Sequence, residues 1–425
     1  MKIRSLLLGT VAAAGLSTAA FATDLGVETG LDVCDDLGLT GLTISSDTNC
    51  LQISGSVKYE FVWGDYNDAG GDGLILLDQF SLVNDGNEDY SVINSGGGLD
   101  HSSSFDSWLK FVATADSSFG PASATIKFDL DNNNVNVSQL FVSIGEGTVI
   151  TAGLADSIFK DGNDEPLNFL GLFHSGAVDA GVIDADDQSD FDGTGGEVLQ
   201  VVTSMDNFWV GGALENIGGS GTLVGVVAYN TDEVKAHASF AVDEALTGGF
   251  DQWIFHSGFE GTFDTVKIVA AYGANNDNGG TESNGLISAS VDLDNFVLAG
   301  SAEFAQRSAG LGGTEWGYGA SIASEVSDGI TVKLGYRHFT DNDSLTDTLD
   351  QVAGQVVAAV SDEVTVTGEA GVIMSGVSSF NGANSIYYGS GKVEWSPGGD
   401  FKASVKGEAN NLGAYKITTD VEKSF

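Results

Sequence analysis

Residues 53–63 read Ile-Ser-Gly-Ser-Val-Lys-Tyr-Glu-Phe-Val-Trp, with apolar and polar side chains in alternation. The apolar parity comprises Ile53, Val57, Tyr59, Phe61 and Trp63, and the polar parity comprises Ser54, Ser56, Lys58 and Glu60. Successive side chains of a β-strand point to opposite sides of the sheet, so a period of two indicates a strand with one apolar and one polar face. This stretch therefore predicts a strand that separates two different environments.

The same alternation recurs along the chain, for example over 234–242, 330–337 and 364–372. Nearly all Lys and Arg residues of the expected strands fall on the polar parity, and Lys423 is the exception. The connections are of two kinds: tight turns, and longer stretches rich in Asp, Asn, Gly and Ser, such as 156–196. Tight turns on one rim and long loops on the other are typical of a transmembrane β-barrel.

The first residues are typical of an export signal. Lys2 and Arg4 precede an apolar run over 6–16, and residues 20–22 form an Ala-x-Ala cleavage site. The run is shorter than the roughly 20 apolar residues that a membrane-spanning helix needs. We therefore expect a signal peptide over 1–22, an N-terminal periplasmic segment over 23–52 and a single barrel domain over 53–425.

Alternation alone leaves open which face lies inside. A β-sandwich buries its apolar face, whereas a membrane barrel turns that face to lipid. The export signal, the chain length and the C-terminal Phe425, which shares the apolar parity of the last strand, favour the barrel. An aromatic C-terminal residue recurs in bacterial outer-membrane barrels. A sheet in lipid must close on itself, because open edges leave backbone groups without hydrogen bonds.

The composition is strongly acidic, with 60 Asp and Glu against 16 Lys and Arg and a net charge of −44. Such a chain repels nucleic acid, so we exclude a nucleic-acid partner. Proteins adapted to high salt and calcium-loaded adhesins share this balance, so charge does not decide the class. Two cysteines, Cys34 and Cys50, are close in sequence in a chain expected to be exported, which predicts a disulfide. A metal site is the alternative, and no His lies nearby to support it.

Residues 33–35 (Val-Cys-Asp) and 48–55 (Thr-Asn-Cys-Leu-Gln-Ile-Ser-Gly) resemble the start of the alphaproteobacterial (Rhizobiales-type) porin family, and 151–159 resemble the strand before its constriction loop. The resemblance implies an all-β, antiparallel transmembrane barrel of 16 strands, trimeric, with the third external loop folded inward. The alternation itself gives five strands before the loop at 156–196 and fifteen after it. We adopt 16 strands as the expectation, with 18–20 as the alternative.

The same resemblance indicates where a constriction would lie, because acids on the inward loop of such porins face basic residues of the early strands. The acidic loop residues here are Asp161, Asp164, Glu165, Asp179, Asp184, Asp186, Asp187, Asp190 and Asp192. The basic wall would be Lys58, Lys110 and Lys127, which could instead be ordinary solvated residues of the lumen. Position 154, where the family often carries Arg, is Leu. A weakly basic wall opposite a dense acidic loop predicts a preference for cations.

No residue pattern indicates an enzyme. The five histidines are scattered, no Ser lies in a signature setting, and the Gly runs at 96–98 and 310–313 lack the strand–helix context of a phosphate-binding loop. We expect no cofactor and no metal, although the Asp-rich stretch 184–192 could bind Ca²⁺ without the spacing of an EF-hand.

Together these features predict a passive outer-membrane channel for small hydrophilic solutes and ions. The expected partners are two further copies of the chain in a homotrimer, outer-membrane lipid and lipopolysaccharide, the barrel assembly machinery, and small polar solutes and cations. A secreted acidic calcium-binding β-rich adhesin or surface-layer protein is the alternative from a different class.

Overall fold

The alternating stretch at 53–63 forms part of a long strand that opens a large antiparallel sheet. A computed structural model describes residues 33–66, 98–131, 134–172, 193–250, 252–277, 280–306, 314–340, 348–375 and 385–425. No helix within these ranges is long and apolar enough to cross a membrane.

One short helix, α1 (Val33–Asp36), precedes the strands in the described ranges. The strands are β1 (Leu42–Ser45), β2 (Cys50–Asp65), β3 (Asp100–Ala115), β4 (Ala122–Asp131), β5 (Asn134–Gly145), β6 (Thr148–Ala155), β7 (Gly196–Met205), β8 (Phe208–Glu215), β9 (Thr222–Asn230), β10 (Val234–Val242), β11 (Trp253–Phe263), β12 (Val266–Asp277), β13 (Gly280–Asp292), β14 (Val297–Gln306), β15 (Thr314–Ser327), β16 (Ile330–Thr340), β17 (Thr348–Ala359), β18 (Val364–Ser375), β19 (Ser385–Gly398), β20 (Phe401–Asn410) and β21 (Tyr415–Ser424).

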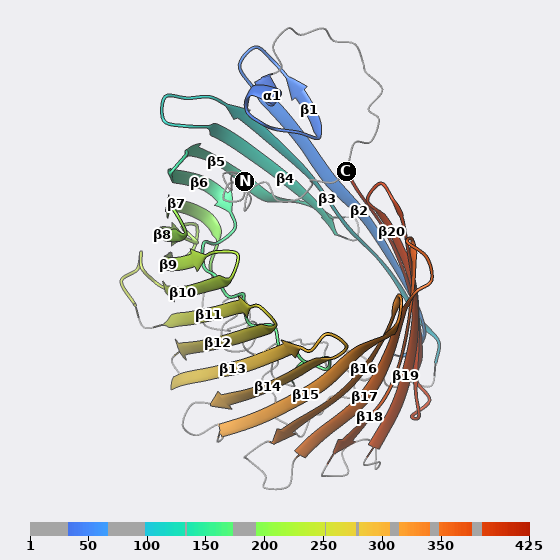
Figure 1. Cartoon of the computed structure of the whole chain (residues 1–425). Coiled ribbons are helices and arrows are strands. Elements are labelled where there is room, and N and C mark those ends of the chain that lie inside the picture. The colour runs from blue at the N-terminus through green and yellow to red at the C-terminus, as the bar shows by residue number, and fades with distance from the viewer. Residues whose placement is uncertain are drawn as a thin grey trace.

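The sheet closes into a barrel (Figure 1). Each strand from β2 to β21 pairs antiparallel with the next, and β21 pairs back onto β2 from Ser56↔Ser424 to Asp65↔Tyr415. Of the 21 strands, β1 pairs with β2 alone, which leaves twenty in the wall. The expectation of 16 strands was therefore wrong. Five strands precede the connection at 156–195 and fifteen follow it, so every short hairpin that the alternation indicates belongs to the wall.

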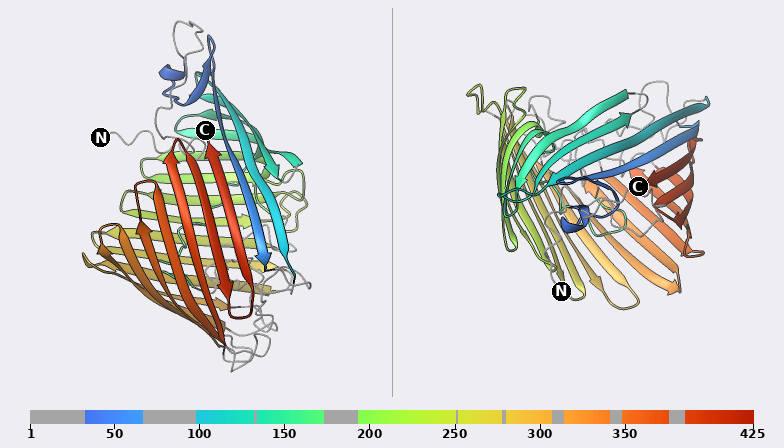
Figure 2. Two further views of the ribbon diagram at one scale, coloured as in Figure 1. Left: turned by 90° about the vertical axis from the view of Figure 1, so that its right-hand side faces the viewer. Right: turned by 90° about the horizontal axis from the view of Figure 1, so that it is seen from above.

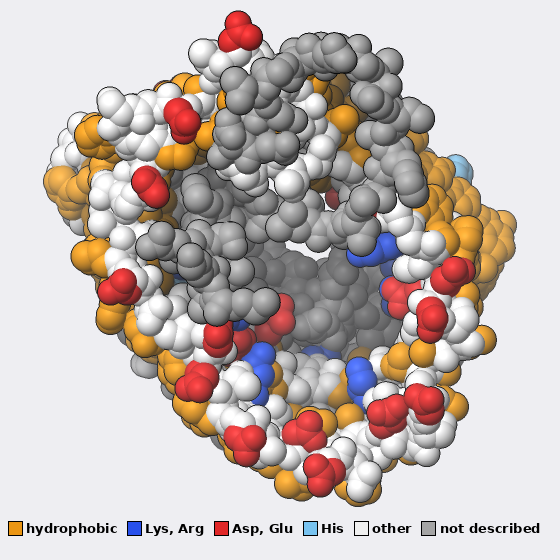
Figure 3. Space-filling view, turned by 45° about the horizontal axis from the view of Figure 1, so that its top comes forward, with side chains coloured by type: hydrophobic (Ala, Val, Ile, Leu, Met, Phe, Trp, Pro, Cys, Tyr) orange, Lys and Arg blue, Asp and Glu red, His pale blue; other side chains and the backbone are white. Residues whose placement is uncertain are grey.

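The apolar face of the sheet is the outer face. In β2, Val57, Tyr59, Phe61 and Trp63 are 36–54 % exposed, whereas Ser56 on the opposite parity is 5 % exposed. Large apolar side chains are exposed on other strands too, among them Val142, Leu199, Ile287, Leu334 and Val405. Figure 3 shows charged side chains inside the opening and apolar ones on the outside of the wall. This arrangement is that of a membrane barrel and the reverse of a sandwich, which buries its apolar faces.

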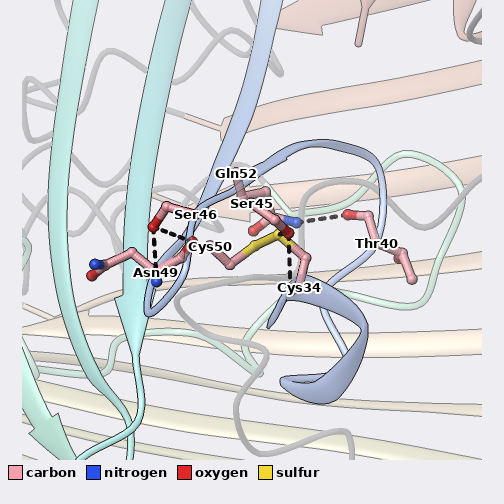
Figure 4. The surroundings of a disulfide bond; sticks show 7 residues. All are labelled: Cys34, Thr40, Ser45, Ser46, Asn49, Cys50 and Gln52. Atoms are coloured by element: carbon pink, nitrogen blue, oxygen red, sulfur yellow. Dashed lines mark hydrogen bonds between the residues drawn. A yellow bond between two sulfur atoms is a disulfide. The ribbon is translucent and has the colours of Figure 1, made fainter. Parts of the chain in front are cut away.

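The helix α1 and the strand β1 project beyond the rim at which the chain ends (Figure 2). A disulfide joins Cys34 of α1 to Cys50 at the start of β2, and both residues are buried. Ser45 of β1 donates a hydrogen bond from its hydroxyl to Cys34 Sγ at 3.1 Å (Figure 4). The predicted disulfide is confirmed. The expected signal peptide at 1–22 and the first ten residues of the expected periplasmic segment lie outside the described residues.

The barrel seam is completed by the C-terminal residue. Gly55 and Phe425 exchange two backbone hydrogen bonds of 2.9 Å, and the Phe425 ring lies over Gly55. A Cβ atom at Gly55 would be 2.6 Å from Phe425 Cζ and 2.9 Å from the backbone oxygen of Trp108, so a side chain there would force the ring and the strand to shift. Phe425 remains 52 % exposed, as expected for a residue on the outer, apolar face.

Candidate functional site

The chain that follows β6 runs along the inside of the barrel. We call residues 156–172 the inward segment. Its backbone N–H groups donate to serine hydroxyls on the inner faces of three strands, each at 2.9 Å: Lys160 to Ser239 of β10, Leu167 to Ser288 of β13, and Phe169 to Ser321 of β15. The blue-green coil inside these strands in Figure 1 is this segment. The described first part of the expected loop therefore folds into the lumen.

An apolar patch on the inner wall holds the inward segment. Ile158 and Leu172 of the segment are buried in one cluster with small and branched apolar residues of the wall, namely Ala213, Val224, Val226, Ala241, Ile254, Val269, Ala271 and Leu286. Removing this surface from water favours the docked position. The segment thus covers an apolar patch on one side of the lumen.

Three inner-face glycines allow the segment to lie directly against the strands. A Cβ atom at Gly258 would be 2.3 Å from Gly162 O, and one at Gly319 would be 2.6 Å from Asn168 Nδ2. A Cβ atom at Gly335 would meet the Leu170 side chain at 2.9 Å. Glycine at a strand position often marks such a close approach of another backbone.

Two buried polar contacts lie beneath the segment. The rings of His237 and His256 stack with centroids 4.9 Å apart, and His256 Nδ1 lies 3.2 Å from Lys160 O. Further along, the buried Arg337 of β16 donates from Nη1 to Leu172 O at 3.1 Å and from Nε to Gln351 Oε1 at 2.6 Å. These contacts of His237, His256 and Arg337 with the segment could not be predicted from the sequence, because they depend on how strands far apart in the sequence pair.

The opposite wall, on β18–β21 and β2–β4, carries charges of both signs. The three predicted lysines, Lys58, Lys110 and Lys127, project inward from β2, β3 and β4, and Lys110 lies directly opposite Lys127. Lysines and carboxylates on this wall form ion pairs at 2.8–3.4 Å, namely Lys127–Asp129, Lys392–Glu394, Lys406–Glu408 and Lys416–Glu408. Like charges directly opposite on a sheet are unfavourable, so the nearby carboxylates stabilise this wall.

The predicted acidic residues separate into three groups. Asp161 and Glu165 are exposed on the inward segment, whereas Asp164 is 5 % exposed and its Oδ2 lies 3.9 Å from His256 Nε2. The remaining predicted acids, Asp179, Asp184, Asp186, Asp187, Asp190 and Asp192, lie outside the described residues. Of the three that are described, two can therefore act on the lumen.

The acidic residues predicted from the sequence did not include Asp156, the first residue of the segment. It accepts a hydrogen bond from Gln139 Nε2 at 2.6 Å and interacts electrostatically with Lys110. Its position directly after the strand at 148–155 could have indicated this role. Leu154, by contrast, pairs with Leu140, whose side chain is on the outer face, so position 154 does not contribute to the lumen. Leu154 therefore gives no support to the predicted cation preference.

The described residues contain no group of three or more His, Cys, Asp and Glu side chains that could hold a metal ion. The stretch 184–192, the candidate for Ca²⁺, lies outside the described residues.

A closed antiparallel sheet with an apolar outer face and a polar, partly filled interior defines a transmembrane β-barrel. No protein-family profile matches the chain, and no curated protein matches it either.

Among solved structures, the chain is similar to several outer-membrane barrels. The outer membrane protein OmpT of Vibrio cholerae, folded in vitro, is 13% identical over 91% of this chain and all of that one, with a TM-score of 0.40. An anion-selective porin from Comamonas acidovorans is 14% identical over 89% of this chain and all of that one, with a TM-score of 0.38. A triple mutant of the Rhodopseudomonas blastica porin is 11% identical over 88% of this chain and all of that one, with a TM-score of 0.41.

Proposed function

We propose that this chain is an outer-membrane porin, a passive water-filled channel through which small hydrophilic solutes and ions diffuse. The observation that carries the proposal is the barrel with its apolar face outward and a segment of its own chain laid along one side of the lumen. The barrel lies in the outer membrane. The resemblance of residues 33–35 and 48–55 to the alphaproteobacterial porin family supports this assignment.

A channel of this kind needs a width and an electric field, and no catalytic group. The inward segment limits the width on the side of β8–β16, and Lys58, Lys110 and Lys127 form the facing wall. Asp156, Asp161 and Glu165 supply negative charge on the segment, so a field crosses the lumen at this level. Polar solutes and ions diffuse through the water of the lumen across this field.

The channel prefers cations. The ion pairs of the charged wall neutralise much of its positive charge, and the whole chain has a net charge of −44. In a partly desolvated lumen, each uncompensated carboxylate changes the energy of an entering ion by about 1 kcal/mol or more. Binding of Ca²⁺ by residues 184–192 belongs to the same proposal and would weaken this preference.

The functional unit is a homotrimer in contact with outer-membrane lipid and lipopolysaccharide, inserted by the barrel assembly machinery. The family resemblance supports the trimer, and the exposed C-terminal Phe425 supports recognition during assembly. The alternative, a secreted acidic adhesin, is not favoured because it would expose the outer apolar face to water.

Swelling of liposomes tests the function. Purified protein reconstituted into liposomes should let small neutral sugars enter and should exclude larger ones, whereas protein-free liposomes should admit neither. Failure of any sugar to enter, together with solubility of the protein without detergent, would refute the proposal. A zero-current potential that shows anion preference in a salt gradient would refute the cation preference alone.

A further inference from the structure

Both limbs of the connection between β6 and β7 meet at a single buried carboxylate. Glu215, the last residue of β8, is fully buried on the inner side of the barrel. Its side chain accepts four hydrogen bonds, from Ser157 Oγ (2.6 Å), Ile158 N (2.9 Å), Gly195 N (2.7 Å) and Gln200 Nε2 (3.1 Å). Ser157 and Ile158 are the second and third residues of the inward segment, and Gly195 belongs to the limb that returns to β7.

The backbone around Glu215 is shaped to bring these donors together. Gly195 has a φ of 78°, in the left-handed region, and a Cβ atom there would be 3.2 Å from Ser157 N. Gly195 O also accepts a hydrogen bond from Asn216 N at 2.8 Å. Gln200 Nε2 donates to Asp156 O at 2.8 Å as well as to Glu215, so it links the first residue of the segment to the same carboxylate.

The contact at Glu215 differs in kind from those along the rest of the segment. Further along, the segment amides bond to the neutral hydroxyls of Ser239, Ser288 and Ser321. Hydrogen bonds to an ionised acceptor are shorter and roughly twice as strong as neutral ones. A carboxylate can remain buried only if donors of this kind surround it.

We propose that Glu215 is a positioning residue that sets the width of the pore by fixing the base of the inward segment against the wall. The inference rests on the proposed channel function and names the residue on which its constriction depends. Without the carboxylate, Ile158 N, Gly195 N and Ser157 Oγ would be buried without this acceptor. A penalty of that kind should raise the population of the undocked segment by roughly tenfold or more.

Single-channel recording and liposome swelling test the proposal with three variants. Glu215→Ala removes the carboxylate, and Glu215→Gln keeps its shape but places an amide among N–H donors. Glu260→Gln is the matched control, since Glu260 is an inner-face carboxylate on β11 that pairs with Lys235 and Lys267 at 3.1 Å. Both Glu215 variants should visit an additional, larger conductance level and admit larger sugars than wild type, while Glu260→Gln keeps the wild-type sugar exclusion and shows no additional level. Folded Glu215 variants with wild-type conductance and sugar exclusion would overturn the inference.

A channel in which residues 160–192 are replaced by a short Gly-Ser linker separates positioning from a general effect on the barrel. In that background, Glu215→Ala should cause no further increase in conductance, and an undiminished increase would overturn the inference. If Glu215→Ala fails to fold, Glu215→Gln carries the same comparison. A wild-type protein that does not conduct would refute the proposed function and this inference together, whereas a conducting wild type with unresponsive Glu215 variants refutes the inference alone.

Discussion

A single methyl group at Gly258 should push the inward segment away from the wall. Gly258 lies on the inner face of β11, and its position for a Cβ atom is 2.3 Å from Gly162 O and 2.5 Å from His237 Cε1. The backbone oxygen of Gly162 cannot rotate away as a side chain could. The substitution Gly258→Ala therefore requires the segment itself to move.

The size of the effect follows from this overlap. Extra atoms in a packed site cost typically 1–3 kcal/mol, which corresponds to a loss of about 5- to 150-fold in the equilibrium for docking. Replacing Gly by Ala within a strand recovers roughly 0.5–1 kcal/mol, and that gain stabilises the barrel whether or not the segment is docked. The barrel should therefore stay folded, and the inward segment should be docked against the wall for a smaller fraction of the time.

Planar-bilayer recording measures this equilibrium directly. Gly258→Ala should spend more time at a larger conductance level than wild type, and the protein should migrate as a folded barrel in electrophoresis. Gly225→Ala on β9 is the control, because a Cβ atom there has no neighbour within 4 Å. Identical conductance in wild type, Gly258→Ala and Gly225→Ala would show that the segment does not narrow the pore.

Three further predictions concern the seam, the disulfide and the charged wall. Gly55→Val should overlap the Phe425 ring and destabilise the barrel by about 1–3 kcal/mol. Heat-modified electrophoresis should show unfolding at a lower temperature than for Gly391→Val, an outer-face glycine whose Cβ atom would have no neighbour closer than 4.0 Å. Equal unfolding temperatures would show that Gly55 does not support the seam. Replacing Cys34 and Cys50 by Ser should lower the free energy of unfolding of the N-terminal segment by about 3 kcal/mol. Proteolysis between residues 37 and 48 should become faster, while the conductance stays the same. An unchanged cleavage rate would show that the disulfide does not stabilise this segment. Changing Lys58, Lys110 and Lys127 to Gln should lower the energy of a cation in the lumen by about 1 kcal/mol for each lysine removed. The zero-current potential in a salt gradient should therefore shift towards stronger cation preference. An unmoved potential would remove these lysines from the constriction.

The wall of the barrel could be predicted from the sequence because alternation is a local property. The face of each residue in β2 follows from its own parity, and even Lys423, which breaks the pattern, lies opposite Val57 on the outer parity. The same alternation predicts five strands before the connection at 156–195 and fifteen after it, and the structure contains these numbers in the barrel wall. The count of 16 came from the family resemblance, whose recognisable residues cover too little of the chain to fix the number of hairpins.

The docking of the inward segment could not be predicted in the same way. Ser239, Ser288 and Ser321 look like any polar residues of alternating strands, and the strand pairing alone brings them under one stretch of backbone. The buried Glu215 likewise has no signature, because its donors come from residues 157, 158, 195 and 200. The density of acidic residues over 161–192 predicted the constriction there. Asp156 lies outside that stretch, and its contact with Gln139 of the wall depends on strand pairing.

The central claim, that the sheet presents its apolar parity to lipid and its polar parity to water, can be tested along β2. Single cysteines at 58, 59, 60, 61, 62 and 63 would be introduced one at a time and exposed, in reconstituted liposomes, to a water-soluble maleimide that does not cross lipid. The native cysteines are joined in a disulfide and buried, so they should not react. Labelling should follow the parity, with cysteines at 58 and 60 reacting and those at 59, 61 and 63 protected, while a cysteine at 62, where Val62 is 7 % exposed, should react slowly. Labelling in the opposite phase, or equally at all six positions, would contradict the account.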